Sequence, residues 1–507
     1  MKIHPSFDLN KISFVAKGVA VGTVVGIVVS LFRFTIGLLV TYTRDAYDFM
    51  RLNPVWILAW ILFSLVVALV VARLIRDEPD IKGAGVRNLE SQLYGISDIN
   101  WFSIFWRKLI GASLSIGSGL ALGRGGPSVH LGGVIGKGVN SFFKGNRSQE
   151  NILISSGVSA GLSAAFNAPL SGVMFILEEV HHKFSGTLLL SAFTSSIVAN
   201  FVALRIFGIE PALSLETAIR FPVEHYLHLV ILGSALAIVG RIYQEVLIHL
   251  PTLYNKLPFP PHYHGLIPFL LVIPVGLYLP TMLGGGTDII DIIDTNRLST
   301  LLLIGIFLFR FIFSLVSYSS GLPGGIFFPV LCIGALVGAI YGNLALDYSS
   351  IDSIYYQNFI MYAMGGLMTA VIKAPLTSII LIAEITGTES QLMPLSLVCL
   401  CTYVVANFLG SKSLYERLME NATKQLESKP NGEKVDVTII VEADQFFDGL
   451  AYKDLNLPEH AQLVEISRYK ETFIPGGDTV LQANDELIIQ CDSGLVPSLR
   501  NYLLKHN

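Results

Sequence analysis

Pro54–Ala72 carries no charged residue over 19 positions, and this run is the feature that most constrains how the chain folds. A helix of about 20 apolar residues spans the hydrocarbon core of a bilayer, so the run predicts a transmembrane helix. Only 14% of the 507 residues are charged, whereas soluble domains carry about a quarter. Further long apolar stretches occupy residues 13–43, 102–122, 150–177, 187–207, 226–249, 264–283, 299–318, 325–347, 358–384 and 389–409. The sequence therefore predicts an all-α polytopic membrane protein.

Basic residues flank the first two predicted spans. Lys11 and Lys17 precede the first span, and Arg73 and Arg76 follow the second. By the positive-inside rule both regions are expected in the cytoplasm, which agrees with two spans between them. The N-terminal stretch shows no signal-peptide cleavage site after a short apolar core. We expect a multi-pass protein of the plasma membrane with cytoplasmic N- and C-termini.

Two pairs of segments repeat along the chain at nearly the same spacing. Ala168–Glu178 (APLSGVMFILE) matches Ala374–Glu384 (APLTSIILIAE), 206 positions later. Residues 123–136 (GRGGPSVHLGGVIG) match residues 325–338 (GIFFPVLCIGALVG), 202 positions later, at three glycines and one proline. Two motifs repeated in the same order indicate a duplicated half. Internal repeats with interrupted helices are typical of transporters.

Glycine followed by proline in the second pair predicts how each helix begins. Glycine lets backbones approach closely, and proline fits the first helical turn, where its missing N–H has no partner in any case. Each motif therefore predicts a helix that begins inside the membrane, with free N–H groups and a partial positive charge at its start. Such an end suits an anion. The alternative is that the glycines serve only tight helix packing.

Four motifs together resemble those of the CLC chloride channel and transporter family, and the similarity runs from about residue 10 to 420. They are GRGGPSVHLGG at 123–133, SGLPGGIFFP at 320–329, NAPLSGVMFILEE at 167–179 and KAPLTSIILIAEITG at 373–387. The resemblance implies two inverted halves with interrupted helices and a homodimer in the lipid bilayer. It also implies a separate pathway for chloride or other small anions in each subunit.

The resemblance further implies which groups bind the anion. The backbone N–H groups of Ile326 and Phe327 are expected to coordinate it, and the Tyr415 hydroxyl is expected to close the site from the cytoplasmic side. Without the motifs, Phe327 is typical of a core residue and Tyr415 of an interfacial anchor. Arg124 resembles a basic residue that draws anions to the outer mouth, with a snorkelling side chain as the alternative.

Two motifs depart from the family pattern. The gating glutamate of the family, which competes with chloride and carries protons, is replaced by Gly125, next to Gly126 in the expected outer site. Glycine neither imitates a bound anion nor takes a proton. GAGVR at 83–87 stands where the family has GSGIP, so Ala84, beside Gly85 in the expected anion-binding loop, replaces a serine whose hydroxyl meets the anion. These changes put coupling and anion preference in question.

Two adjacent glutamates end the first APL segment. Glu178 has a repeat partner in Glu384, which indicates a structural duty shared by both halves. Glu179 has Ile385 in the corresponding place, so its role is not shared. It matches the inner proton-transfer glutamate of exchanging family members and is our candidate for that role. The alternative is a charge that faces solvent at the cytoplasmic edge of the membrane.

The chain changes character after Asn421. We expect a CLC-like transmembrane domain at 1–421, a polar linker at 422–434 and a small α/β or α+β cytoplasmic domain at 435–507. Alternating apolar residues in VDVTIIVEA and DELIIQC predict strands. Residues 449–492 resemble the TrkA-C type of regulator-of-K⁺-conductance domain. Domains of that type pair and bind small ligands or ions, so a small ligand of this domain is an expected partner.

Three functions are compatible with these residues. The leading one is a passive, uncoupled anion channel or uniporter, because the gate position is Gly125. An anion/proton antiporter with a relocated outer proton carrier is the first alternative, and retained Glu179 supports it. An anion-sensing membrane regulatory protein is the second. We find no residue pattern for an enzyme, no cysteine spacing for a metal site, and expect neither a cofactor nor a nucleic-acid partner.

Overall fold

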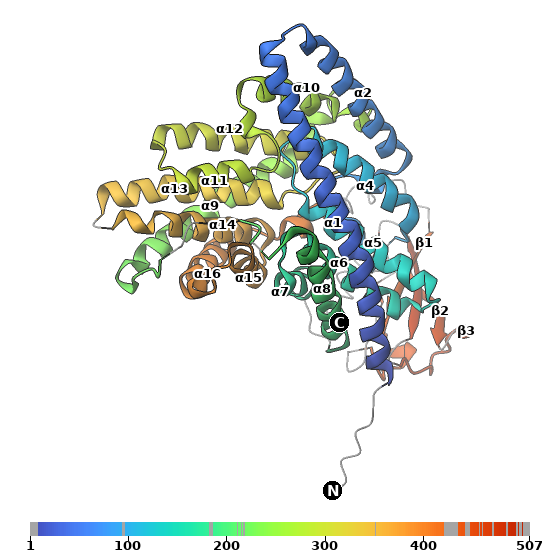
Figure 1. The fold of residues 1–507 in the computed structure, drawn as a ribbon. Coiled ribbons are helices and arrows are strands. Elements are labelled where there is room, and N and C mark those ends of the chain that lie inside the picture. Colours follow the sequence, from blue (N-terminus) through green and yellow to red (C-terminus); the bar gives the residue numbers. More distant parts are fainter. Residues whose placement is uncertain are drawn as a thin grey trace.

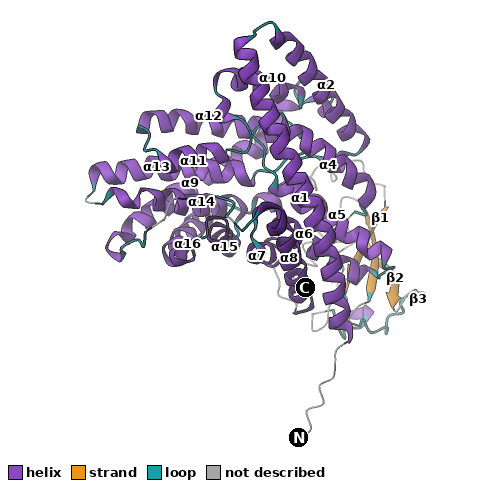
Figure 2. Ribbon diagram, viewed as in Figure 1, coloured by secondary structure: helices purple, strands orange, loops and turns teal. Residues whose placement is uncertain are grey.

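The structure is a computed structural model, and it describes most of the chain. The described residues are 9–93, 97–181, 186–209, 211–213, 215, 219–349, 351–419, 434–441, 447–455, 457–458, 460–468, 471–482, 485–492, 495 and 499. Helices make up the part before residue 420, and strands follow in the tail (Figures 1 and 2). The predicted linker, apart from Lys434, lies outside the described residues.

The helices fall into two successive sets of eight within the described residues. The first set is α1 (Leu9–Leu52), α2 (Trp56–Asp77), α3 (Val86–Leu93), α4 (Trp101–Gly117), α5 (Gly125–Phe142), α6 (Arg147–Phe166), α7 (Pro169–Phe175) and α8 (Gly186–Phe207). The second set is α9 (Tyr226–Tyr254), α10 (Leu266–Tyr278), α11 (Thr287–Thr295), α12 (Thr300–Ser319), α13 (Phe327–Tyr348), α14 (Tyr356–Ile372), α15 (Pro375–Thr386) and α16 (Leu392–Phe408). In Figure 1, α12–α16 lie on the left and α4–α6 on the right.

Long apolar helices confirm the multi-pass prediction. Within the described residues, six helical segments are long and apolar enough to cross a membrane, and they lie in α1, α2, α8, α9, α12 and α13. Nearly all of the uncharged run Pro54–Ala72 lies in α2. The first predicted span belongs to α1, which is longer than expected and continues without a break for 44 residues.

Two of the predicted apolar stretches each divide into two helices, α6 with α7 and α14 with α15. Each break falls just before a proline at the start of the second helix, Pro169 or Pro375. Proline disfavours helical geometry in the residue before it and cannot donate to the preceding turn. The residues that cap the first helices, Asn167 and Lys373, both adopt left-handed backbone, with φ of 56° and 60°. The repeat in the sequence is therefore a repeat in backbone geometry.

Glycines later in the repeated motifs serve tight helix packing, as the alternative interpretation expected. A Cβ added to Gly132 of α5 would lie 2.0 Å from the carbonyl oxygen of Gly157 in α6. A Cβ added to Gly338 of α13 would lie 2.4 Å from the carbonyl oxygen of Phe359 in α14. Both distances are far below van der Waals contact. These packed pairs hold the first helix of each motif in place.

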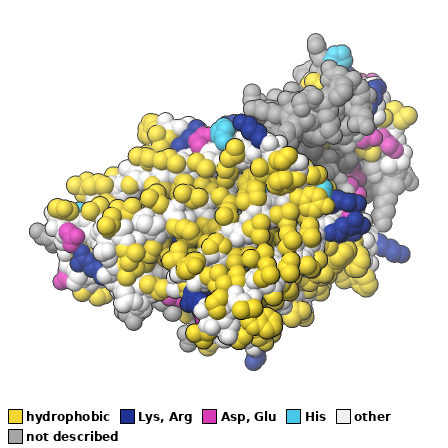
Figure 3. Space-filling model, turned by 90° about the horizontal axis from the view of Figure 1, so that it is seen from above, with side chains coloured by type: hydrophobic (Ala, Val, Ile, Leu, Met, Phe, Trp, Pro, Cys, Tyr) yellow, Lys and Arg dark blue, Asp and Glu magenta, His cyan; other side chains and the backbone are white. Residues whose placement is uncertain are grey.

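Large apolar side chains cover much of the face of the molecule seen in Figure 3. On α2, for example, Leu62 and Val66 are 57% and 58% exposed, and on α12 Leu301 and Ile312 are 82% and 60% exposed. Apolar surface of this extent is unusual on a soluble monomer. It fits a helix surface that contacts lipid.

The tail forms a small sheet of its own. Its strands are β1 (Lys434–Ile440), β2 (Ala461–Arg468), β3 (Glu471–Phe473) and β4 (Glu486–Asp492). They pair antiparallel in the order β1-β4-β2-β3 around a separate apolar core, and β1 and β4 overlap the two runs in which strands were predicted. Arg468 donates to both carboxylate oxygens of buried Asp485, at 2.7 and 2.6 Å. Asp485 is therefore an ion-pair partner, as Asp478 is of Lys453.

Candidate functional site

The two repeated motifs meet at Gly123 and Gly325. The Gly123 N–H donates to the Gly325 carbonyl at 2.7 Å, and the Gly325 N–H donates to the Gly123 carbonyl at the same distance. The two residues occupy equivalent places in the repeat. This exchange relates the halves locally by a two-fold arrangement and brings the starts of α5 and α13 together.

The helices α5 and α13 both begin at this meeting point, as predicted. The first backbone bonds within them run from Ser128 N–H to the Arg124 carbonyl, 3.0 Å, and from Val330 N–H to the Ile326 carbonyl, 2.9 Å. The first N–H groups of a helix have no partner in its own ladder. The amides of Ile326 and Phe327, the expected anion ligands, therefore lie at such a start, and the helix dipoles add positive potential there.

The loop before α3 joins the same place. A Cβ added to Gly126 would lie 2.6 Å from the Ala84 Cβ and 3.2 Å from the Gly325 Cα. Gly85 has a φ of 86°, and a Cβ there would lie 2.1 Å from the ring of His130. Glycine is thus required at 85 by both the backbone and its neighbour. Three of the predicted positions, Ala84, Gly85 and Gly126, are brought together with the start of α13.

A buried lysine holds the backbone of this loop. Lys108 of α4 is fully buried, and its ammonium group donates to the carbonyl oxygens of Ile81 and Gly83 at 2.8 and 2.7 Å. The two bonds fix the backbone that leads into Ala84.

A cavity of about 220 Å³ opens beside this loop, and we call it the tyrosine cavity. Its lining includes Ala84, Gly85, Arg87, Tyr318 and Tyr415. The Tyr415 side chain is 1% exposed, and within the described residues its hydroxyl has no hydrogen-bond partner. A buried hydroxyl without a protein partner is costly unless something else binds it. The structure thus places Tyr415 with Ala84, not alone at a lipid interface.

A second cavity of about 250 Å³, which we call the arginine cavity, lies beside the residues that precede α5. Gly123, Arg124 and Phe328 contribute to its lining, together with Arg44 and Asp288, which form an ion pair. The Arg124 guanidinium lies 5.0 Å from the centre of the Phe328 ring. Arg124 therefore faces a cavity and an aromatic ring, which differs from a side chain that snorkels to the membrane surface.

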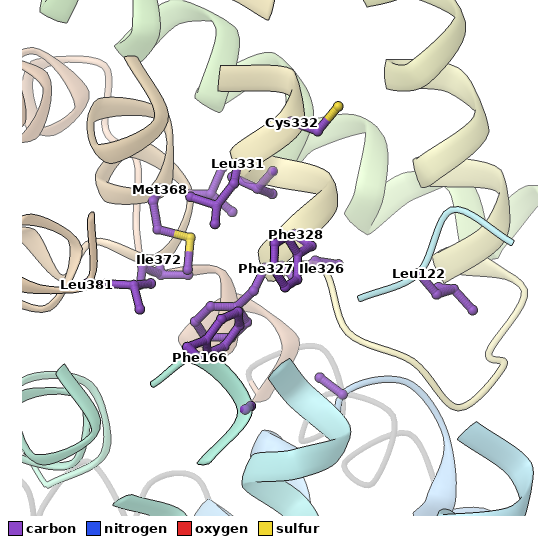
Figure 4. Packing of buried hydrophobic residues seen from close by; sticks show 14 of the residues in the cluster. Leu122, Phe166, Ile326, Phe327, Phe328, Leu331, Cys332, Met368, Ile372 and Leu381 are labelled. Carbon is purple, nitrogen blue, oxygen red and sulfur yellow. The ribbon is translucent and has the colours of Figure 1, made fainter. Parts of the chain in front are cut away.

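Gly125 faces an aromatic ring that the sequence did not point to. A Cβ at Gly125 would lie 2.7 Å from the Phe166 Cζ and 3.4 Å from the Phe327 Cβ. Phe166 is buried, with its ring centre 6.2 Å from that of Phe327 and 5.3 Å from that of Phe328 (Figure 4). Phe166 thus occupies the space that a side chain at position 125 would need. The sequence offered one signal for Phe166, which is its position directly before the NAPL motif.

Glu179 lies at the end of the α7 segment, in a π-helical turn that spans Ile176–Val180. Its side chain is 4% exposed and accepts a hydrogen bond from the Ser413 hydroxyl, two residues before Tyr415. The alternative of a solvent-facing charge therefore does not describe this side chain. Burial of this kind makes the charge of a carboxylate costly.

Glu178 caps the start of α15, and Glu384 caps the start of α7. The Glu178 carboxylate accepts from the N–H groups of Leu376 and Thr377 at 3.0 and 2.7 Å. The Glu384 carboxylate accepts from those of Leu170 and Ser171 at 2.9 and 2.8 Å. These bonds confirm the prediction that the two glutamates share a structural role. It joins α7 to α15.

Converging helix starts, a buried hydroxyl and two cavities beside the motif residues define a membrane protein with a buried site suited to an anion. The family described as "Voltage gated chloride channel" matches residues 63–407, and the family described as "TrkA-C domain" matches residues 437–504. The chain belongs to the CLC family of anion channels and transporters.

Similar proteins are found among exchangers. The H(+)/Cl(-) exchange transporter ClcA of Klebsiella pneumoniae (strain 342) is 32% identical over 387 residues, which cover 74% of this chain and 81% of that one. The same exchanger of Salmonella arizonae is 32% identical over 459 residues, 84% of this chain and 94% of that one.

Two solved structures share the fold. A slow cyanobacterial Cl-/H+ antiporter has a TM-score of 0.75 at 28% identity, covering 83% of this chain and 99% of that one. A eukaryotic CLC transporter has a TM-score of 0.66 at 21% identity, covering 80% and 74%. The predicted inverted repeat with interrupted helices and a small C-terminal domain is thus confirmed as the fold class.

Proposed function

We propose that this chain conducts chloride or a similar small anion passively, as an uncoupled channel or uniporter. The observation that carries the proposal is Gly125 at the start of α5, where a carboxylate would sit in an exchanger of this family. Glycine has no group that competes for the helix N–H groups, and no group that carries a proton. The pathway therefore lacks its outer proton carrier.

The anion is bound by partial charges, not by a full charge in contact. Amides at the starts of α5 and α13 and the hydroxyl of Tyr415 supply the donors. Donors of this kind bind an anion without trapping it, which fast release requires. The arginine cavity is the outer mouth and the tyrosine cavity the inner mouth in this proposal. Arg124 at the outer mouth raises the local anion concentration.

A proton-coupled exchanger is the second candidate, and Glu179 favours it. The carboxylate is buried and bonded to Ser413 beside the tyrosine cavity. The similar ClcA proteins are described as exchange transporters, and the similar cyanobacterial protein is described as an antiporter. In that case a group other than residue 125 takes the proton at the outer side.

Several further features belong to the same proposal. The protein is a homodimer in the plasma membrane with both termini in the cytoplasm, and each subunit has its own pathway. The flanking basic residues support that orientation. The tail, which matches the TrkA-C domain, regulates conduction and binds a small ligand or ion.

The test is flux through purified protein in liposomes, with chloride, nitrate and fluoride, each with and without a proton gradient. We expect chloride to move down its gradient without proton movement in the opposite direction. Chloride-driven proton uptake in wild type would overturn the uncoupled mechanism and favour the exchanger. Chloride binding without measurable flux would favour an anion-sensing regulator.

A further inference from the structure

Tyr318 brings a second hydroxyl to the tyrosine cavity. It stands near the end of α12, just before the loop that leads to α13, and it lines this cavity together with Tyr415 and Ala84. Its hydroxyl oxygen lies 3.3 Å from where a Cβ on Gly83 would be. Tyr318 is therefore placed against the anion-binding loop itself.

The chemistry of the lining gives this hydroxyl its significance. Ala84 presents only a methyl group, and Leu247 and Leu418 add apolar surface. Among the described lining residues, Tyr318, Ser319 and Tyr415 carry hydroxyl groups, and Lys82, Arg87 and Asn88 add polar groups. Of the three hydroxyl-bearing residues, Tyr318 is the one whose hydroxyl lies against Gly83, next to Ala84. A tyrosine hydroxyl has one proton to donate and two lone pairs to accept with. The Tyr318 hydroxyl proton can therefore be donated to an anion in the cavity.

We propose that Tyr318 is an anion ligand that determines specificity in the tyrosine cavity, where it supplies the hydroxyl that Ala84 lacks. The anion is held between the Tyr318 and Tyr415 hydroxyls as it passes from the cavity to the helix starts. This inference rests on the proposed anion conduction. It adds a residue that none of the repeated motifs contains.

Tyr318→Phe is the direct test, because it removes one oxygen and keeps the ring. Chloride affinity of the purified protein, measured by isothermal titration calorimetry, should weaken roughly tenfold or more, as expected for losing a hydrogen bond to a charged group. Relative liposome fluxes of chloride and nitrate should change with it.

Tyr254→Phe is the matched control. The Tyr254 hydroxyl donates to the Val316 carbonyl of the same helix, α12, at 2.9 Å, but it does not line the cavity. Its loss should leave chloride affinity unchanged. An equal loss of affinity in both variants would mean that helix α12 has been disturbed, and it would overturn the proposal.

Ala84→Ser provides a second variant, which does not depend on how well Tyr318→Phe folds. In the wild-type background a new hydroxyl beside Tyr318 should tighten chloride binding only slightly, and in the Tyr318→Phe background it should restore most of the loss. Strictly additive effects in this cycle would overturn the proposal. If wild type neither binds nor conducts chloride, the proposed function itself fails. If wild type conducts and Tyr318→Phe behaves like it, only this inference fails.

Discussion

Glu178 and Glu384 occupy equivalent places in the two halves, and each caps the helix that belongs to the other half. Each carboxylate receives two backbone N–H bonds at a helix start, where negative charge is favoured by the helix dipole. Thr377 adds a hydroxyl bond to Glu178 at 2.8 Å. The exchange ties α7 to α15 and keeps Glu179, the next residue, in a fixed position beside Ser413.

Removing either cap should destabilise the transmembrane domain. Glu178→Gln or Glu384→Gln loses the charge and turns one acceptor into an NH₂ group that cannot accept from a backbone N–H. Each change should cost about 1–3 kcal/mol, seen as a lower apparent melting temperature of the purified protein. Glu416→Gln is the control, because Glu416 pairs with Lys412 on an exposed surface. Equal melting temperatures for all three variants would contradict a structural role for the caps.

Gly125→Glu should slow chloride flux. The new carboxylate would compete with chloride for the N–H groups at the start of α5, and its protonation would relieve that competition, so flux should rise as pH falls. We expect a slowing of roughly tenfold at neutral pH. Chloride-driven proton uptake in liposomes measures whether coupling appears with Glu179 in place. Unchanged rate and pH dependence would show that residue 125 does not face the pathway.

The Phe166 ring determines how well that glutamate fits. Its Cζ would lie 2.7 Å from the new Cβ, so the ring must move before the carboxylate reaches the helix start. Gly125→Glu combined with Phe166→Ala should therefore show a stronger pH dependence than Gly125→Glu alone. Phe166→Ala by itself should raise chloride flux, because it opens the space that the ring fills. Liposome flux of the three variants at two pH values tests this.

Ala84→Ser should shift the preference between chloride and nitrate. The serine hydroxyl adds a second donor beside Tyr318, so chloride affinity should rise only slightly, whereas the changed donor geometry should alter the discrimination between the two anions. The site has room, because Ala84 lines the tyrosine cavity. Relative fluxes and affinities for the two anions are the measurement. If both stay as in wild type, the loop does not face the anion.

Deleting residues 430–507 should leave conduction intact and change only its regulation. The anion-binding groups all lie before the linker. Within the described residues, the Arg147 N–H at the start of α6 donates to Glu486 of β4 at 3.1 Å, which joins the tail to the helices. Because α6 ends at Phe166, Glu486→Ala should reproduce part of the deletion's effect on the regulation of flux. Loss of flux in a correctly assembled deletion protein would contradict a modular tail.

Local signals in the sequence determined much of this fold. Uncharged runs marked the spans, because a helix in lipid must be apolar along its length. Pro169 and Pro375 marked helix starts, because proline acts on the residues next to it. The repeat placed Glu178 opposite Glu384 and predicted a shared structural duty, although it did not identify Leu376 or Leu170 as partners.

Only the tertiary structure decided which distant residues meet at the pathway. Gly125 and Phe166 belong to different helices, and Ala84 lies in the loop before α3 whereas Tyr318 belongs to α12, so no local pattern links either pair. The motifs identified Gly125 and Ala84 as departures from the family pattern. The effect of each departure depends on which side chain fills the space beside it. That depends on how α5, α6, α12 and the loop before α3 pack together. Packing of this kind is set by side-chain volume summed over the whole core, which a single sequence does not display.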